Sequence, residues 1–115
     1  MPITGVSALY NTDLDWELVA HHANWRVSQL AAHFRISVRT LQRFFHQEMG
    51  MSATEWLLVL RQTQALTLLL AGRSVKETAS ELGYHYAYHF SRDFKSYWAC
   101  NPGRKDELAG LARTI

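Results

Sequence analysis

The chain has 115 residues, of which 48% are hydrophobic, and a formal net charge of +2. This apolar content, with four tryptophans and five phenylalanines, excludes a disordered chain and suffices for one packed domain or two small ones. A single cysteine excludes an internal disulfide framework, and the longest apolar-rich run, residues 56–71, is too short and too polar to cross a bilayer. We therefore expect a cytoplasmic protein with no membrane partner.

Helix signals recur along the sequence, and no segment shows the alternating pattern of a strand. Thr12 precedes the first apolar stretch with helical spacing and is a suitable cap for it. Residues 52–55 and 74–77 fit the capping box, and Asn101-Pro102 places a cap before a proline at the first helical position. The sequence predicts an all-α fold with seven helices, over residues 13–23, 28–34, 38–48, 53–71, 75–82, 88–98 and 102–112.

Residues 27–45 and 75–94 repeat one pattern at a spacing of 48 or 49 residues. Two copies are too few for a solenoid, which needs about three repeats to bury a core. The repeat is therefore a duplicated supersecondary unit. Its clearest shared motifs are Leu41-x-Arg43-x-Phe45 and Phe90-x-Arg92-x-Phe94.

Each copy has the features of a helix-turn-helix. A small residue, Ala31 or Ala79, stands where two short helices would cross closely, and apolar residues follow at fixed offsets. The tight turn of the second copy contains Gly83, which suits positive φ, whereas the first copy has Arg35 there. A helix-turn-helix that recurs in register indicates a protein that reads DNA.

Polar residues gather on one face of the second helix in each copy. In the helix over 38–48, apolar residues turn inward and leave a polar face of Arg39, Gln42, Arg43 and His46. Arginine can bind guanine and glutamine can bind adenine through two hydrogen bonds each, so this face has the chemistry of major-groove recognition. The corresponding outward residues of the helix over 88–98 are Tyr88, His89, Arg92 and Lys95.

The helix between the two copies sets the expected organisation of the chain. Its length of about 18 residues corresponds to roughly 27 Å, while successive major grooves on one face of DNA are ~34 Å apart. One chain could therefore fill two adjacent grooves as a monomer. We expect a first subdomain at 1–51, a linker helix at 52–72 and a second subdomain at 73–115.

The motifs, taken together and in order, resemble the DNA-binding domain of the AraC/XylS family of bacterial transcription regulators over about residues 13–103. They are Leu30-Ala31, Ser37-x-Arg39-Thr40-Leu41-x-Arg43-x-Phe45, Gly50-Met51-Ser52, Trp56-Leu57, Arg61-x-x-x-Ala65, Ser74-Val75-x-x-x-Ala79, Gly83-Tyr84 and Phe90-Ser91-Arg92-x-Phe94-Lys95, closed by Pro102. The resemblance implies two helix-turn-helix subdomains joined by a long helix. The chain departs from the family pattern at Thr78, where an aliphatic residue is usual, and at Ala99, where glycine is common.

The resemblance also implies which residues contact DNA. The family's base-reading positions fall on Arg39, Gln42, Arg43, Tyr88, His89 and Arg92. Contacts to the DNA backbone are expected from Ser37, Thr40, His46, Lys76 and Lys95. A family member that activates transcription would also contact RNA polymerase, and it would act at the bacterial nucleoid. The chain would be either a short stand-alone regulator or the C-terminal part of a longer, effector-responsive one.

Other interpretations have less support in the residues. A helical module that binds a protein partner would share the fold, but its binding would not depend steeply on salt. His85 and His89 have the spacing of metal ligands, yet no third ligand follows, so we expect no metal site and no cofactor. The sequence contains no paired carboxylates that face one another on a helix and no glycine-rich phosphate loop, so it gives no indication of an enzyme. Arg61 is expected to pair inside the protein rather than with DNA.

Overall fold

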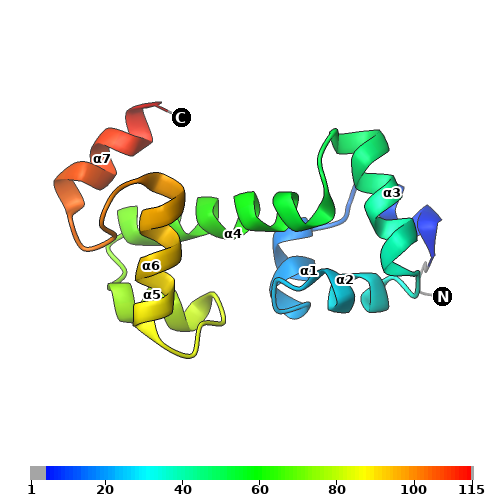
Figure 1. Cartoon of the computed structure of the whole chain (residues 1–115), viewed down its shortest axis with the longest axis horizontal. Coiled ribbons are helices and arrows are strands. Elements are labelled where there is room, and N and C mark those ends of the chain that lie inside the picture. Colours follow the sequence, from blue (N-terminus) through cyan, green and yellow to red (C-terminus); the bar gives the residue numbers. More distant parts are fainter. Residues whose placement is uncertain (1–4, 115) are drawn as a thin grey trace. The chain divides into compact units, whose positions relative to one another are not determined.

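The computed structural model describes residues 5–114, and every regular element in that range is helical (Figure 1). The predicted all-α fold with seven α-helices is confirmed. A short 3-10 helix, which the sequence did not predict, precedes them. The elements are η1 (Val6–Tyr10), α1 (Trp16–His22), α2 (Val27–His33), α3 (Val38–Met49), α4 (Ala53–Leu70), α5 (Val75–Glu81), α6 (Ala87–Trp98) and α7 (Lys105–Thr114). None of the described helices is both long and apolar enough to cross a membrane.

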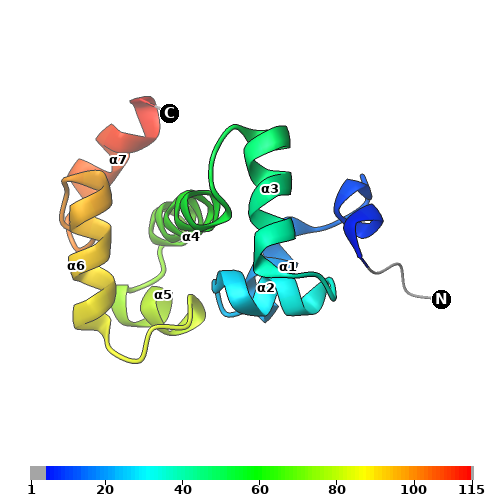
Figure 2. The same ribbon diagram turned by 45° about the vertical axis from the view of Figure 1, so that its right-hand side comes forward.

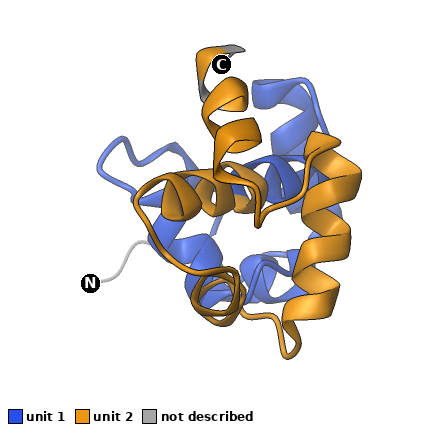
Figure 3. Cartoon of the chain, turned by 90° about the vertical axis from the view of Figure 1, so that its left-hand side faces the viewer, with its two compact units in different colours: residues 1–60 blue, residues 61–115 orange. Residues whose placement is uncertain are grey.

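The chain folds as two compact units, residues 1–60 and 61–115, and α4 contributes to both (Figure 3). Each unit contains one helix-turn-helix, formed by α2 and α3 in the first and by α5 and α6 in the second (Figure 2). The finer division into 1–51, 52–72 and 73–115 stays a prediction.

The core of the first unit forms between the helix pair and an aromatic cluster. Ala31 is buried at the crossing of α2 and α3, together with Leu30, Phe34, Leu41 and Phe45. The ring of Trp16 lies 5.7 Å from those of Phe34 and Phe45 and 5.0 Å from that of Trp56, measured between ring centroids. Aromatic rings in such edge-on and tilted arrangements add to the free energy gained by burial. This cluster joins α1 and the start of α4 to the helix pair.

The second unit repeats this packing, with a polar residue at one of the repeat's buried positions. Ala79, Leu82, Phe90 and Phe94 are buried, as the repeat predicts. Thr78 is also completely buried, at the position that corresponds to Leu30. Its hydroxyl donates to the carbonyl oxygen of Ser74 at 2.8 Å, so the polar atom is satisfied inside α5.

Two helix starts differ from the sequence prediction. α1 begins at Trp16 because the side chain of Asp15, and not that of Thr12, accepts from a backbone N–H of the first turn, that of Leu18 at 3.2 Å. α7 begins at Lys105, so Pro102 is not its first residue. There Asn101 Oδ1 accepts from the N–H of Gly103 at 2.8 Å, and this local turn delays the helix.

The 3-10 helix η1 and its N-cap residue Gly5 pack against the end of α2 and against α3. The N–H of Gly5 donates to the carbonyl oxygen of Phe34 at 2.7 Å. The ring of Tyr10 meets the ring of Phe44 edge-on at 5.1 Å, and its hydroxyl donates to Glu48 Oε1 at 3.2 Å. Two of these contacts reach α3, so η1 holds the helix that carries the predicted DNA-reading face.

Candidate nucleic-acid interface

α3 presents a polar surface because its apolar side is fixed in the core. Leu41, Phe44 and Phe45 are buried, and this turns Arg39 and Arg43 outward, where both are exposed. His46 is exposed one turn further along. These three side chains therefore lie on the outward side of α3, as the sequence predicts.

The start of α3 is closed by its own hydroxyl groups. Ser37 Oγ accepts from the N–H of Thr40 at 3.0 Å, and the two hydroxyl oxygens lie 2.8 Å apart. Ser37 is thus the N-cap of this helix. Ser37 is exposed and Thr40 half-buried at the first turn of α3, where the helix dipole favours an anion such as phosphate.

Gln42 is placed differently from the sequence prediction, which put it on the outward face of α3. Its side chain is half-buried and is directed at the start of α4. Oε1 accepts from the backbone N–H of Ala53 at 2.7 Å, and Nε2 donates to the hydroxyl of Thr54 at 3.4 Å. Spacing along α3 could not show this, since both partners belong to the next helix.

α6 presents an exposed aromatic and basic surface at its first turns. Phe90 and Phe94 are buried, and Tyr88, His89 and Arg92 are exposed. Tyr88 keeps 70% of its surface, and its ring centroid lies 5.3 Å from that of His89. Tyr86, the N-cap residue, is 67% exposed, and its ring lies 5.8 Å from that of His89. Sequence reasoning missed Tyr86, because it precedes the helix.

Arg92 lies beside a carboxylate. Its Nε is 3.5 Å from Asp93 Oδ1, while Asp93 Oδ2 accepts from the hydroxyl of Tyr84 at 3.1 Å. The side chain of Arg92 is 59% exposed, and an ion pair of this kind in solvent is weak. The guanidinium therefore stays accessible to a stronger anionic or base partner.

Arg61 pairs inside the second unit, as expected. Its Nε and Nη2 donate to the carbonyl oxygen of Leu82 at 3.2 and 2.7 Å, and its guanidinium carbon lies 3.8 Å from the centre of the Tyr84 ring. Burial raises the pKa of Tyr84 to about 12, with the nearby Asp93 acting in the same direction and Arg61 against it. Tyr84 therefore stays a neutral hydrogen-bond donor near neutral pH.

The remaining predicted contacts lie at helix ends. Lys76 is exposed in the first turn of α5, and Lys95 is exposed in the last turn of α6. Within residues 5–114, no group of three or more His, Cys, Asp or Glu side chains is placed to hold a metal ion. Both units thus combine a buried aromatic pair on the second helix with exposed basic and polar residues on its opposite side.

Comparison with known proteins agrees with this arrangement. The profile of a family described as "Helix-turn-helix domain" matches residues 30–106. The crystal structure of a transcriptional regulator from Chromobacterium violaceum, described as an AraC-type DNA-binding domain-containing protein, is similar with a TM-score of 0.58. That likeness covers 73% of this chain and 74% of the other at 26% identity. The chain belongs to the AraC-type helix-turn-helix family. The resemblance found in the sequence is thereby confirmed.

Relatives of this AraC-type domain are longer proteins. An uncharacterized HTH-type transcriptional regulator of Haemophilus influenzae is 34% identical over 102 residues, which is 88% of this chain and 34% of that protein. The transcriptional activator RhrA of Rhizobium meliloti is 28% identical over 94 residues, 79% of this chain and 30% of that protein. The AraC-type chain thus spans about a third of the length of these relatives.

Proposed function

We propose that this AraC-type chain binds double-stranded DNA sequence-specifically and thereby regulates transcription, with α3 and α6 in the major groove. One observation carries the proposal. In both units, the helix with the buried aromatic pair exposes its other side, and that side contains arginine at the same position of the repeat, Arg43 and Arg92. Membership of a helix-turn-helix family and the relatives described as transcriptional regulators support it.

The first reader would use α3. Arg39 and Arg43 can each bind guanine through two hydrogen bonds. Ser37, Thr40 and His46 would contact phosphates at the ends of this surface, which fixes the register of the helix but carries no sequence information. Gln42, also a base-reading candidate in the sequence, instead bonds to Ala53 and Thr54 at the start of α4.

The second reader would use α6. Arg92 can bind a guanine, while the exposed rings of Tyr88 and His89 offer both hydrogen bonds and apolar contact, as thymine methyl groups require. Lys76 and Lys95 would contact phosphate. Tyr86 extends this aromatic surface, and because its ring is exposed we add it to the residues proposed to contact DNA.

At the scale of the complex, we propose a monomer whose two readers enter successive major grooves. A regulator of this kind acts in the cytoplasm, at the nucleoid, and an activator would also contact RNA polymerase. Such a binder has no need of a cofactor or of catalysis. The relatives' designation as regulators or activators supports the transcriptional role.

Selection of binding sites from random duplex DNA at near-physiological salt tests the proposal. Two short boxes about one helical turn apart (~10 bp) are expected if both readers engage as one monomer. A single box would contradict base reading by the second unit. No enrichment, together with binding that ignores salt, would contradict the function and favour a protein-interaction module.

A further inference from the structure

The side chain of Gln42 lies at the junction between α3 and α4. Its Oε1 faces the backbone N–H of Ala53 at 2.7 Å, and its Nε2 faces the Thr54 hydroxyl at 3.4 Å. Ala53 is the first residue of α4 and is completely buried. A backbone N–H can only donate, so the shorter contact requires the amide oxygen on that side. Both ends of the amide are therefore occupied within the protein.

These contacts compete with base recognition. The first N–H groups of any helix lack partners within the helix, and where they are buried away from water a side chain can supply the acceptor. At the start of α4, Ser52 Oγ accepts from the backbone N–H of Glu55, and Gln42 Oε1 accepts from the backbone N–H of Ala53. Glutamine reads adenine by using both ends of the same amide. Turning outward to do so would leave the buried N–H of Ala53 without that acceptor, which is the costly way to lose a hydrogen bond.

We propose that Gln42 is a positioning residue, and that it does not read a base. It ties α3 to the first turn of α4 and so holds the outward face of α3, with Arg39 and Arg43, in the orientation that the groove needs. This inference rests on the proposed DNA-binding function. In consequence, α3 reads bases through its arginines, and the operator contains no base pair specified by Gln42.

Two substitutions separate positioning from base reading. Gln42→Glu keeps an oxygen acceptor for Ala53 and for the Thr54 hydroxyl, and its negative charge is favourable at a helix start. It cannot grip adenine as glutamine does. Gln42→Leu removes the acceptor at similar volume. Gln47 is exposed on the same helix, so Gln47→Glu and Gln47→Leu are matched controls for the added charge and the lost amide.

The first measurement needs no DNA. Hydrogen exchange of the Ala53 amide, followed by NMR on the full chain, should accelerate about tenfold in Gln42→Leu, as expected for loss of one hydrogen bond. Gln42→Glu and both Gln47 variants should exchange like the wild type. If the Ala53 amide exchanged at the wild-type rate in Gln42→Leu, the inference would be overturned. The capping hydrogen bond from the Ala53 N–H to Gln42 would then not exist.

The second measurement is site selection at a temperature where every variant is folded. Gln42→Leu should bind all sequences several-fold more weakly, with unchanged preference at every base pair. Gln42→Glu should match Gln47→Glu in affinity and the wild type in preference. A changed preference at one base pair in the Gln42 variants alone would overturn the inference. A wild-type chain that selects no sequence contradicts the proposed function and the positioning role with it, while the exchange experiment still decides whether the cap exists.

Discussion

The turn residue with a left-handed backbone differs between the two helix-turn-helix units. Arg35 has φ of 57° and Gly83 has φ of 83°. The N–H of each donates to the carbonyl oxygen three residues earlier at 3.1 Å, so the two turns make the same bond. A side chain with a Cβ costs roughly 1–2 kcal/mol in this region, whereas glycine adopts it freely. The first turn is therefore strained and the second is not.

We expect opposite effects from substitution in these turns. Arg35→Gly should raise the free energy of unfolding by about 1 kcal/mol, and Gly83→Ala should lower it by a similar amount. Urea denaturation followed by circular dichroism measures both. Arg35→Ala is the control, because it removes the charge but keeps the Cβ. A gain in Arg35→Ala as large as that in Arg35→Gly would show that charge, and not backbone conformation, is responsible.

Helical spacing predicted the orientation of most side chains in the candidate interface. Arg39, Arg43 and His89 are exposed because buried aromatic residues at steps of one and four fix the helix that carries them. The same spacing failed for Gln42, whose partner Ala53 is eleven residues later, on another helix. Periodicity within one element carries no information about such a contact.

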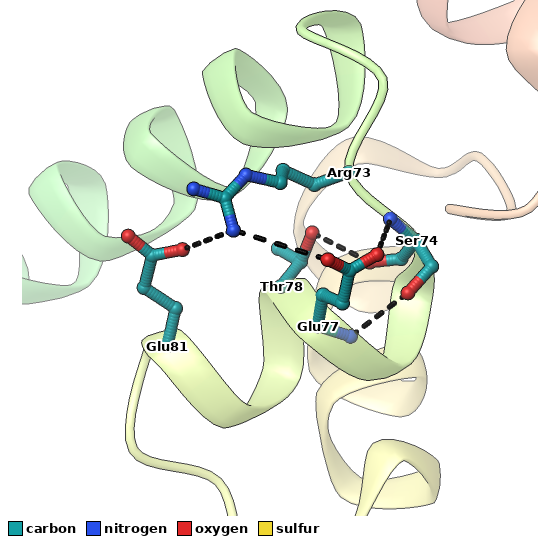
Figure 4. A network of polar contacts seen from close by, with 5 residues as sticks. All are labelled: Arg73, Ser74, Glu77, Thr78 and Glu81. Carbon is teal, nitrogen blue, oxygen red and sulfur yellow. Dashed lines mark hydrogen bonds and ion pairs between the residues drawn. The ribbon is translucent and has the colours of Figure 1, made fainter.

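At the scale of elements, α5 begins with a complete capping box and a neighbouring pair of ionic contacts (Figure 4). Ser74 Oγ accepts from the N–H of Glu77 at 3.0 Å, and Glu77 Oε1 accepts from the N–H of Ser74 at 3.2 Å. Arg73 Nη1 lies 3.9 Å from the carboxylate of Glu77 and 3.4 Å from that of Glu81. The hydrogen bonds with Ser74 lower the pKa of Glu77 below its ordinary value of 4.5, with the charge of Arg73 acting in the same direction.

This shift predicts an acid-sensitive part of the stability. The folded state holds the ionised form of Glu77 more strongly than the unfolded chain does, so its contribution is present above the ordinary pKa of 4.5 and is lost as pH falls through the lower folded-state pKa. Glu77→Gln can keep the capping hydrogen bonds without the charge. The free energy of unfolding of Glu77→Gln should therefore decline less than that of the wild type as pH falls below about 4.5.

The control for that prediction is Ser74→Ala, which removes the cap itself. It should cost about 1 kcal/mol near neutral pH, as N-cap losses do. Denaturation curves of the three proteins between pH 3 and 7 make the comparison. Parallel declines of the wild type and Glu77→Gln would mean that Glu77 has the same pKa in the folded and unfolded states.

Helix existence could be predicted from sequence more completely than helix boundaries. The capping boxes at 52–55 and 74–77 marked the starts of α4 and α5, and the predicted bounds of α2 to α6 agree with the structure to within one residue. The starts of α1 and α7 were wrong because several neighbouring polar residues could cap them, and only the packed structure selects Asp15 and the turn at Asn101. The 3-10 helix η1 has no cap signal, because its N-cap residue is a glycine, which makes no side-chain capping hydrogen bond.

At the scale of the whole molecule, the weak net charge of +2 makes the pattern of charges decisive. If Lys76 and Lys95 contact phosphates, alanine at either should reduce the slope of log affinity against log salt by about 1 and leave sequence preference unchanged. Lys105, at the start of α7 and outside the proposed interface, is the matched control. Titrations at several salt concentrations measure the slope. If Lys105→Ala reduced the slope equally, the effect would come from the net charge of the chain and not from phosphate contacts of Lys76 and Lys95.

The two units also make a joint prediction, because Arg43 and Arg92 belong to different units and hold the same position in the repeat. If both readers bind one DNA molecule, alanine at either should cost about 1–3 kcal/mol and relax preference at its own base pair. Effects at independent sites add to within about 0.5 kcal/mol, so the double variant should show their sum. Arg92→Lys separates the alternatives in the second unit, since lysine keeps a phosphate contact but not a two-bond grip on guanine. If Arg92→Ala leaves base preference intact, α6 does not read sequence through this arginine. If Arg92→Lys binds like the wild type, the arginine contributes only a positive charge that contacts the DNA phosphates.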